Sequence, residues 1–189
     1  MAQAPELTAQ ESIDRIVSLV APLGVTSEQV RDLRGASRSI AALQKSFSAA
    51  DVLVPGELVR QTPSVMTALE DAGVTFRVPV DLVEARDAML GVSFAEGAIT
   101  ETGSIILAER SLGDRGIGLL ALNQIMLIPV ERIVPSLTEA AQIVREVALR
   151  GGYASFVTGP SRTADIEMSL TVGVQGPGTV HYIFVESMR

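Results

Sequence analysis

The apolar residues near the N-terminus recur with the period of an α-helix. Further along the chain, short strand-like apolar segments alternate with segments of helical period. Near the N-terminus, Thr8 and Glu11 have the spacing of a capping box and precede an apolar face of helical period, which predicts a helix over residues 8–21. A second helical stretch is expected to begin near Ser27 and to continue through residue 50. We therefore expect residues 1–48 to form a helical segment packed on the rest of the chain.

The remaining residues, 49–189, have the pattern of an α/β domain. The β-branched run DVLVP and the later run VTFRVPV flank a helical stretch that starts at Thr62 and Pro63 and ends before Gly73. A strand, a helix and a strand in this order are typical of a βαβ unit. Strands this short and apolar favour a parallel sheet that is covered on both faces.

Helices and strands continue to alternate toward the C-terminus. Two strands, over residues 97–100 and 104–108, are expected to bend at residues 101–103, where Gly103 permits a positive φ. The other expected elements are a helix over 81–90, a loop over 110–116, buried apolar segments over 117–129 and 132–135, a helix over 137–152 opened by a capping box of Ser136 and Glu139, a strand over 153–158, a helix over 164–173 and a strand over 179–185. This order predicts a three-layer α/β domain with at least five strands.

Composition and charge exclude several classes of function. The chain has 15 basic and 22 acidic residues, and Lys45 is its only lysine, so no basic stripe is present for nucleic acid. It has no cysteine, which excludes disulfides, thiolate nucleophiles, cysteine-ligated zinc and any iron-sulfur cluster held by its own thiolates. Neither a secretory signal nor a membrane span is expected, so we predict a cytoplasmic protein. Its high apolar content leaves room for a homo-oligomeric interface.

Two motifs are expected at the carboxyl ends of strands, where open α/β sheets bind their ligands. They are TETGS at residues 100–104 and TGPSRTADIE at residues 158–167. Glycine lets the backbone approach a ligand, hydroxyls and an arginine fork can hold an anion, and a following helix presents free amides. The candidate ligand-binding residues are Thr102, Gly103, Ser104, Gly159, Pro160, Ser161, Arg162, Thr163, Asp165 and Glu167. The alternative is a helix start, with Ser161 or Thr163 as the cap, the acids complementing the helix dipole and Arg162 in solvent.

Other single residues are weighed in the same way. Glu101 lies in the turn after an apolar strand and is the candidate catalytic residue, as a nucleophile or general base, or else an ordinary turn acid. His181, the only histidine, is expected to be packed or hydrogen-bonded within its strand, and no metal site is expected. Arg110 and Arg115 either reach an anionic ligand at the same edge or are solvated.

Three segments together resemble the lactate utilisation protein C family, which is defined by the LUD domain. They are FAEGAITETGSIILAER, MLIPVERIV and FVTGPSRTADIEMSLTVGVQGPGTVHYIFV, and the resemblance is dense over residues 90–185. This sequence departs from the family in having Gln175 where histidine is common, and in lacking a histidine near Glu131 and Arg132. Roles that rest on those histidines do not transfer to this chain.

The resemblance implies a Rossmann-like three-layer sandwich similar to the sugar-phosphate isomerase and CoA-transferase group. It also implies a part in oxidising L-lactate to pyruvate together with iron-sulfur partner proteins. Because this chain has no cysteine, the clusters are expected in those partners, and the chain itself is expected to bind a small anion and no cofactor.

Two alternatives stay open, as does the question of whether the isolated chain is an enzyme. One is a stand-alone enzyme acting on a phosphorylated or CoA-linked substrate with Glu101 as base or nucleophile, since residues 101–103 have the Glu-x-Gly form found in CoA transferases. The other is a structural scaffold.

Overall fold

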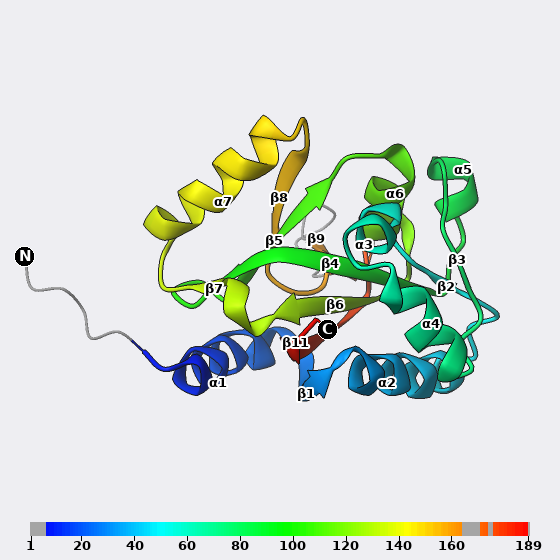
Figure 1. Ribbon diagram of the computed structural model, residues 1–189, viewed down its shortest axis with the longest axis horizontal. Helices are drawn as coiled ribbons and strands as arrows, with labels where there is room; N and C mark the ends of the chain where they lie inside the picture. The colour runs from blue at the N-terminus through cyan, green and yellow to red at the C-terminus, as the bar shows by residue number, and fades with distance from the viewer. Residues whose placement is uncertain (1–6, 164–170, 174–175, 189) are drawn as a thin grey trace, which may run out of the picture.

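A mainly parallel β-sheet forms the centre of the molecule (Figure 1). The computed structural model describes residues 7–163, 171–173 and 176–188. Across the sheet, parallel neighbours follow the order β1 (Thr26–Asp32), β11 (Thr179–Ser187), β6 (Asn123–Pro129), β4 (Leu90–Ile99), β2 (Val52–Leu53) and β3 (Phe76–Arg77). The βαβ unit predicted from residues 51–80 is confirmed, because β2 and β3 pair in parallel.

Strand β4 changes partners half-way along its length. Its first half pairs in parallel with β6 as far as Phe94, and its second half pairs antiparallel with β5 (Ser104–Glu109). A register shift between Ala95 and Gly97 separates the two halves and places Glu96 in a β-bulge. The short strand β7 (Ile133–Val134) and strand β8 (Tyr153–Val157) extend this second part, while β9 (Arg162–Thr163) and β10 (Thr171–Val172) form a separate pair. The sheet therefore divides beside Glu96.

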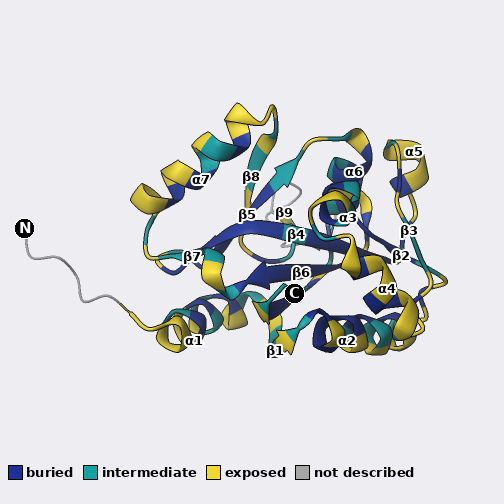
Figure 2. Cartoon of the chain, in the orientation of Figure 1, coloured by how far each residue is buried: buried dark blue, intermediate teal, exposed yellow. Residues whose placement is uncertain are grey.

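Helices cover both faces of the sheet. Their bounds are α1 Ala9–Val20, η1 Ala21–Leu23, α2 Leu33–Ser46, α3 Gly56–Gln61, α4 Ser64–Asp71, α5 Leu82–Ala85, α6 Leu112–Leu120, η2 Val130–Arg132 and α7 Leu137–Leu149. Because side chains alternate along a strand, Leu127 of β6 packs in the core beneath α2 and α4, whereas Met126 packs beneath α1. The central strands are accordingly buried along their length, and the exposed residues lie on the outer sides of the helices (Figure 2).

The N-terminal region agrees only partly with its expected helices. The first helix and its capping box are confirmed, since Thr8 N donates to Glu11 at 2.8 Å and Glu11 N donates to Thr8 Oγ1 at 3.2 Å. The helix expected from Ser27 is wrong over β1, and α2 begins only at Leu33. The sequence of β1 is polar, but its backbone pairs in parallel with the buried strand β11, so tertiary pairing overrides local propensity. The expected domain boundary at residues 48 and 49 stays a prediction.

Several later elements also differ from expectation. The hairpin is confirmed, with Ile99 paired to Ser104. The helix expected over 81–90 is only the single turn α5, and the loop expected over 110–116 already contains the start of α6, capped by Ser111. The helix predicted over 164–173 is wrong at its end, where β10 pairs with β9, and its residues 164–170 lie outside the described part of the chain. Among the described residues, no helix is long and apolar enough to cross a bilayer.

Candidate functional site

The structure brings the two glycine-containing motifs together. Ser104 begins β5 and Thr158 follows β8, and because these strands are antiparallel neighbours the two hydroxyls meet at 2.7 Å. Thr102 adds a third hydroxyl, donating from Oγ1 to Ser104 Oγ at 2.8 Å. These side chains form a chain of hydroxyls that bridges the two motifs.

Helix α1 and the turn after it pack directly onto the glycines of both motifs. Gly103 has φ +71°, and a Cβ atom there would lie 2.7 Å from Val20 Cγ1 of α1. Gly159 has φ +99°, and a Cβ atom there would lie 3.0 Å from Val25 Cγ2. Tyr182 lies buried beneath, and burial raises the pKa of its hydroxyl well above the usual value. The glycines thus allow close approach of the N-terminal segment.

Arg162 is also engaged by the N-terminal segment. Its Nη2 donates to the carbonyl oxygen of Leu23 at 2.6 Å, at the end of η1. The amide of Ser161 donates to Pro177 O at 2.9 Å, and the carbonyl of Ser161 accepts from Gly173 N at 2.9 Å. Arg162 and Thr163 form the short strand β9, whereas both interpretations of this motif placed them at the start of a helix. Pro160 is half-buried beside them, and the candidates Asp165 and Glu167 lie outside the described residues.

Glu101 lies at the start of helix α7. Its Oε2 accepts a hydrogen bond from the backbone N of Leu137 at 3.1 Å, and its own backbone N donates to Pro135 O at 3.0 Å. The side chain is exposed. In this position the carboxylate satisfies a free amide of the helix and complements the positive end of its dipole.

A groove lies at the carboxyl ends of β6 and β11, beside the bulge in β4. It has a volume of about 320 Å³, and its walls are Gln61, Phe94, Ala95, Glu96, Pro129, Glu131, Arg132, Glu146, Arg150 and Met188. A wider hollow bordered by Ser64 and Glu186 adjoins it, sharing Gln61, Glu131 and Met188. Open α/β sheets bind ligands beyond the carboxyl ends of their parallel strands, so this carboxyl-edge groove is in the position expected of a ligand site.

The floor of the carboxyl-edge groove is the buried carboxylate of Glu96. Arg150 Nη2 lies 2.8 Å from Glu96 Oε2, and Arg132 Nε donates to the backbone oxygen of Glu96 at 2.8 Å. Arg132 also lies 3.4 Å from Glu146 Oε2 on α7. Only 7% of the Glu96 side chain is exposed, against 36% for Arg132 and 37% for Arg150. The bulge therefore directs one buried acid toward two half-exposed arginines.

A second buried acid, Glu57 of α3, lies next to this floor. It accepts hydrogen bonds from Arg60 at 2.7 Å and Gln61 at 2.8 Å, and Arg110 lies 3.5 Å away. Burial raises the pKa of Glu57, but the hydrogen bonds from Gln61 and Arg60 and the charge of Arg110 outweigh it, so the pKa is lowered overall. Gln61 Nε2 is also 3.4 Å from Glu96, so its amide joins the two acids.

Behind Glu96 a smaller cavity holds about 20 Å³ of space that water can occupy, enough for about one water molecule. Its polar walls are Glu57, Ser93, Glu96, Glu109 and Asp114. Burial raises the pKa of Glu109 to about 7; Arg115, 4.0 Å away, opposes this shift, and Asp114 adds to it. The cavity and the carboxyl-edge groove share Phe94 and Glu96, so Glu96 lies between them.

Two further expectations concern the arginines and the histidine. Arg110 pairs with Glu57, and Arg115 stacks over the ring of Tyr153 at 4.8 Å, so both lie against protein groups. His181 is hydrogen-bonded to Thr26 at 2.7 Å and Glu28 at 3.0 Å between β1 and β11, which confirms the expectation that it is hydrogen-bonded within the sheet. In the described part of the chain no three acids or histidines cluster as a metal site.

The sequence reasoning missed the residues of the carboxyl-edge groove. Glu96 and Arg132 lie within segments that carry the family resemblance, but no local motif marks them as neighbours. The contact between Arg132 and Glu96 spans 36 residues, and that between Arg150 and Glu96 spans 54. The one available signal was the pair Glu96 and Gly97 inside an apolar strand, because glycine there often marks a bulge.

Comparison with known proteins gives a consistent result. Residues 69–185 match the LUD domain. Proteins named Lactate utilization protein C are similar: that of Geobacillus kaustophilus is 38% identical over 105 residues, 53% of this chain and 44% of its own length. The Bacillus subtilis protein is 36% identical over 109 residues, 56% of this chain and 45% of its own length. The Bacillus velezensis protein is 30% identical over 154 residues, which are 74% of this chain and 64% of its own length. The chain thus spans about half the length of most of these relatives.

The fold also matches a solved structure. A crystal structure of a DUF162 family protein from Deinococcus radiodurans superposes with a TM-score of 0.69 over 95% of this chain and 99% of that one. The two sequences are 21% identical, so the match concerns the fold alone.

Proposed function

This chain belongs to the LUD-domain family, and we propose from that membership that it takes part in lactate utilisation. The observation that carries the proposal is the match of residues 69–185 to the LUD domain, together with relatives named Lactate utilization protein C. The resemblance in the sequence points the same way, because its three segments lie largely within the matched region.

The reaction we propose is the oxidation of L-lactate to pyruvate, carried out with redox partner proteins. Lactate loses two electrons and two protons in this step, so an electron acceptor is required. The 189 residues contain no cysteine, and iron-sulfur clusters are held mainly by cysteine thiolates. We therefore assign the clusters to the partners, and to this chain the binding of a small carboxylate next to them.

We further propose that the fold belongs with the sugar-phosphate isomerase and CoA-transferase group. The parallel strand order β1-β11-β6-β4-β2-β3 and the helices on both faces support this three-layer Rossmann-like assignment. Ligand binding at the carboxyl edge of the sheet would follow from the same topology.

Reconstitution with the cluster-carrying partners tests the proposed function. We expect the chain alone to leave an artificial electron acceptor oxidised in the presence of L-lactate, and the chain with its iron-sulfur partners to reduce it. The matched control is the partner proteins without this chain. If the partners alone reduce the acceptor at the full rate, the chain has no part in the oxidation and the proposal fails.

A further inference from the structure

We propose that the carboxyl-edge groove is a binding site for a singly charged carboxylate, anchored by Arg132 and Arg150 and positioned by Glu96. The choice of lactate and pyruvate as ligands rests on the proposed function, whereas the location and charge of the site rest on the groove itself. The described residues of the two sequence motifs, 100–104 and 158–163, are not part of it.

The two arginines keep donors available after their protein contacts are made. A guanidinium has five N–H groups in a fixed plane. Arg132 uses Nε for the Glu96 backbone and Nη2 for Glu146, and Arg150 uses Nε for the Glu146 carbonyl and Nη2 for the Glu96 carboxylate. Within the described chain, Nη1 of each arginine has no protein partner. A planar carboxylate in the groove matches donors of this kind.

Glu96 holds the two guanidiniums in place before any ligand arrives. One arginine bonds its carboxylate and the other its backbone oxygen, so both side chains converge on one residue at the bulge. The Glu96 side chain is almost completely buried and lies at the bulge within the core strand β4. Glu96 is therefore a positioning residue that fixes the geometry of the anion-binding pair.

The acids of the groove disfavour a ligand with several negative charges. Its walls carry the two arginines and three acids, Glu96, Glu131 and Glu146. A dianionic phosphate or a CoA moiety with several phosphates would be repelled by these acids more strongly than a carboxylate. The apolar wall of Phe94, Pro129 and Met188 suits a short aliphatic tail. The ligand class is thus a small monocarboxylate.

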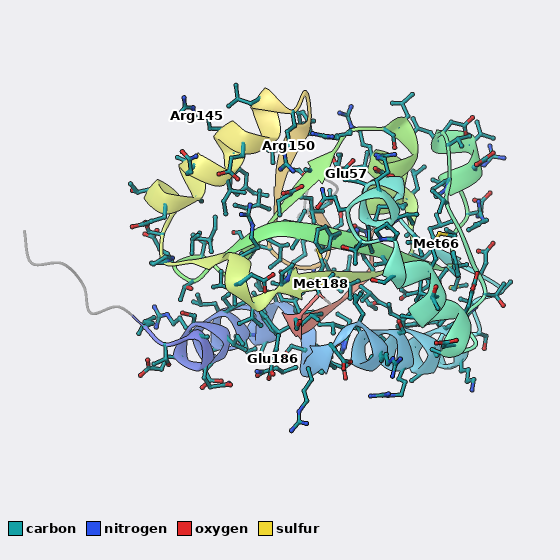
Figure 3. The ribbon with its side chains drawn as sticks, viewed as in Figure 1. Glu57, Met66, Arg145, Arg150, Glu186 and Met188 are labelled. Atoms are coloured by element: carbon teal, nitrogen blue, oxygen red, sulfur yellow. The ribbon has the colours of Figure 1, made fainter. Side chains whose placement is uncertain are left out.

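Calorimetric titration of the full chain, without partner proteins, with pyruvate, L-lactate and inorganic phosphate tests the site. A charge-assisted hydrogen bond corresponds to about a ten- to hundredfold change in affinity, so Arg150→Gln should weaken pyruvate and lactate binding by about that factor. Arg145→Gln is the matched control, because Arg145 is exposed on the opposite side of α7 (Figure 3) and its loss should leave affinity within about twofold. Phosphate should bind more weakly than pyruvate.

Two more variants keep the test decisive if Arg150→Gln does not fold. Arg132→Lys keeps the charge and loses the planar fork, and should weaken pyruvate binding about tenfold. Glu131→Gln removes an exposed acid from the rim and should strengthen pyruvate binding about twofold. The proposal is overturned if the wild type binds neither carboxylate at millimolar concentration, or if the Arg132, Glu131 and Arg150 variants all bind like wild type.

The outcome is separable from that of the proposed function. Carboxylate binding that depends on Arg150, without any lactate oxidation in the presence of partners, would leave the site standing and reject the function. Lactate oxidation with partners that is unchanged in a folded Arg150→Gln protein would support the function and reject the site.

Discussion

The surface around Gly103 and Gly159 and the carboxyl-edge groove differ in what fills the space beside the sheet. At the two glycines, apolar side chains of the N-terminal segment approach the backbone to within van der Waals distance, and Arg162 bonds a carbonyl of that segment. In the groove the space is open, and charged side chains from three separate regions of the chain line it. A glycine-containing motif at a strand end can therefore allow a helix to pack closely. The open groove, in contrast, is lined by residues that form no motif in the sequence.

The comparison is tested most severely at Gly103. Substitution by alanine should cost about 2–4 kcal/mol of unfolding free energy, because the left-handed backbone is strained and the new Cβ meets Val20 of α1. Gly73→Ala is the matched control, since Gly73 has φ +73° and a Cβ atom added there would contact no other part of the chain within 4 Å; it should cost only about 1–2 kcal/mol. Urea denaturation measures both. Equal losses would show that α1 does not press on the first motif.

Next in size is the pH dependence that arises from Glu109 beside the groove. Its folded pKa of about 7 lies above the ordinary 4.5, so the folded state binds the proton more tightly than the unfolded state does. Its contribution to stability is present below pH 4.5 and is lost as the pH rises through 7.

The Glu109→Gln variant lacks this titration. Relative to wild type it should gain about 1–2 kcal/mol between pH 5 and pH 8, a figure reduced for partial solvent screening. Denaturation at the two pH values measures the gain. A constant difference between the two proteins would show that the pKa of Glu109 is the same in the folded and the unfolded protein, as it is for an exposed acid.

How much of the structure can be predicted from the sequence depends on how far apart in the sequence the residues lie that determine each feature. The capping box of Thr8 and Glu11, the hairpin at Gly103 and the buried parallel strands follow from local pattern, and each is found in the structure. Strand β1 could not be predicted in this way, because its polar residues form a strand only through pairing with β11.

The same distinction between local and long-range features applies to the candidate site. The hydroxyls of Ser104 and Thr158 meet because two strand ends meet, which the sequence allows one to anticipate. The pairing of Arg150 with Glu96 depends on the bulge in β4 and on where α7 ends, and neither the bulge nor the packing of α7 is encoded in adjacent residues. Charged residues that build a site from distant parts of a chain are recognised only once the register of the strands is known.

A smaller effect is expected at Arg162. Because its guanidinium is exposed and donates one hydrogen bond to Leu23 O, Arg162→Ala should cost about 1 kcal/mol of unfolding free energy. Thermal melts with and without millimolar pyruvate or phosphate add the decisive measurement. If an anion raises the melting temperature of wild type and Arg162→Ala abolishes that rise, the second motif is an anion site as its sequence suggests, and it does not serve only to pack the N-terminal segment.

The smallest expected effect concerns Glu101. The test distinguishes between two roles for its carboxylate, stabilising the start of α7 or acting as a nucleophile. Replacing its carboxylate by an amide removes a charge near the helix N-terminus and should cost about 0.3–1 kcal/mol. Glu139→Gln is the matched control, because Glu139 is an exposed acid in the first turn of the same helix and its replacement should cost a similar amount.

The catalytic alternative predicts a different result, since Glu101→Gln would abolish partner-free turnover of an activated ester and Glu139→Gln would not. Parallel denaturation and ester-turnover measurements on the two variants decide the matter: equal, small stability losses without any difference in turnover assign Glu101 to the start of α7, and a selective loss of turnover assigns it to catalysis.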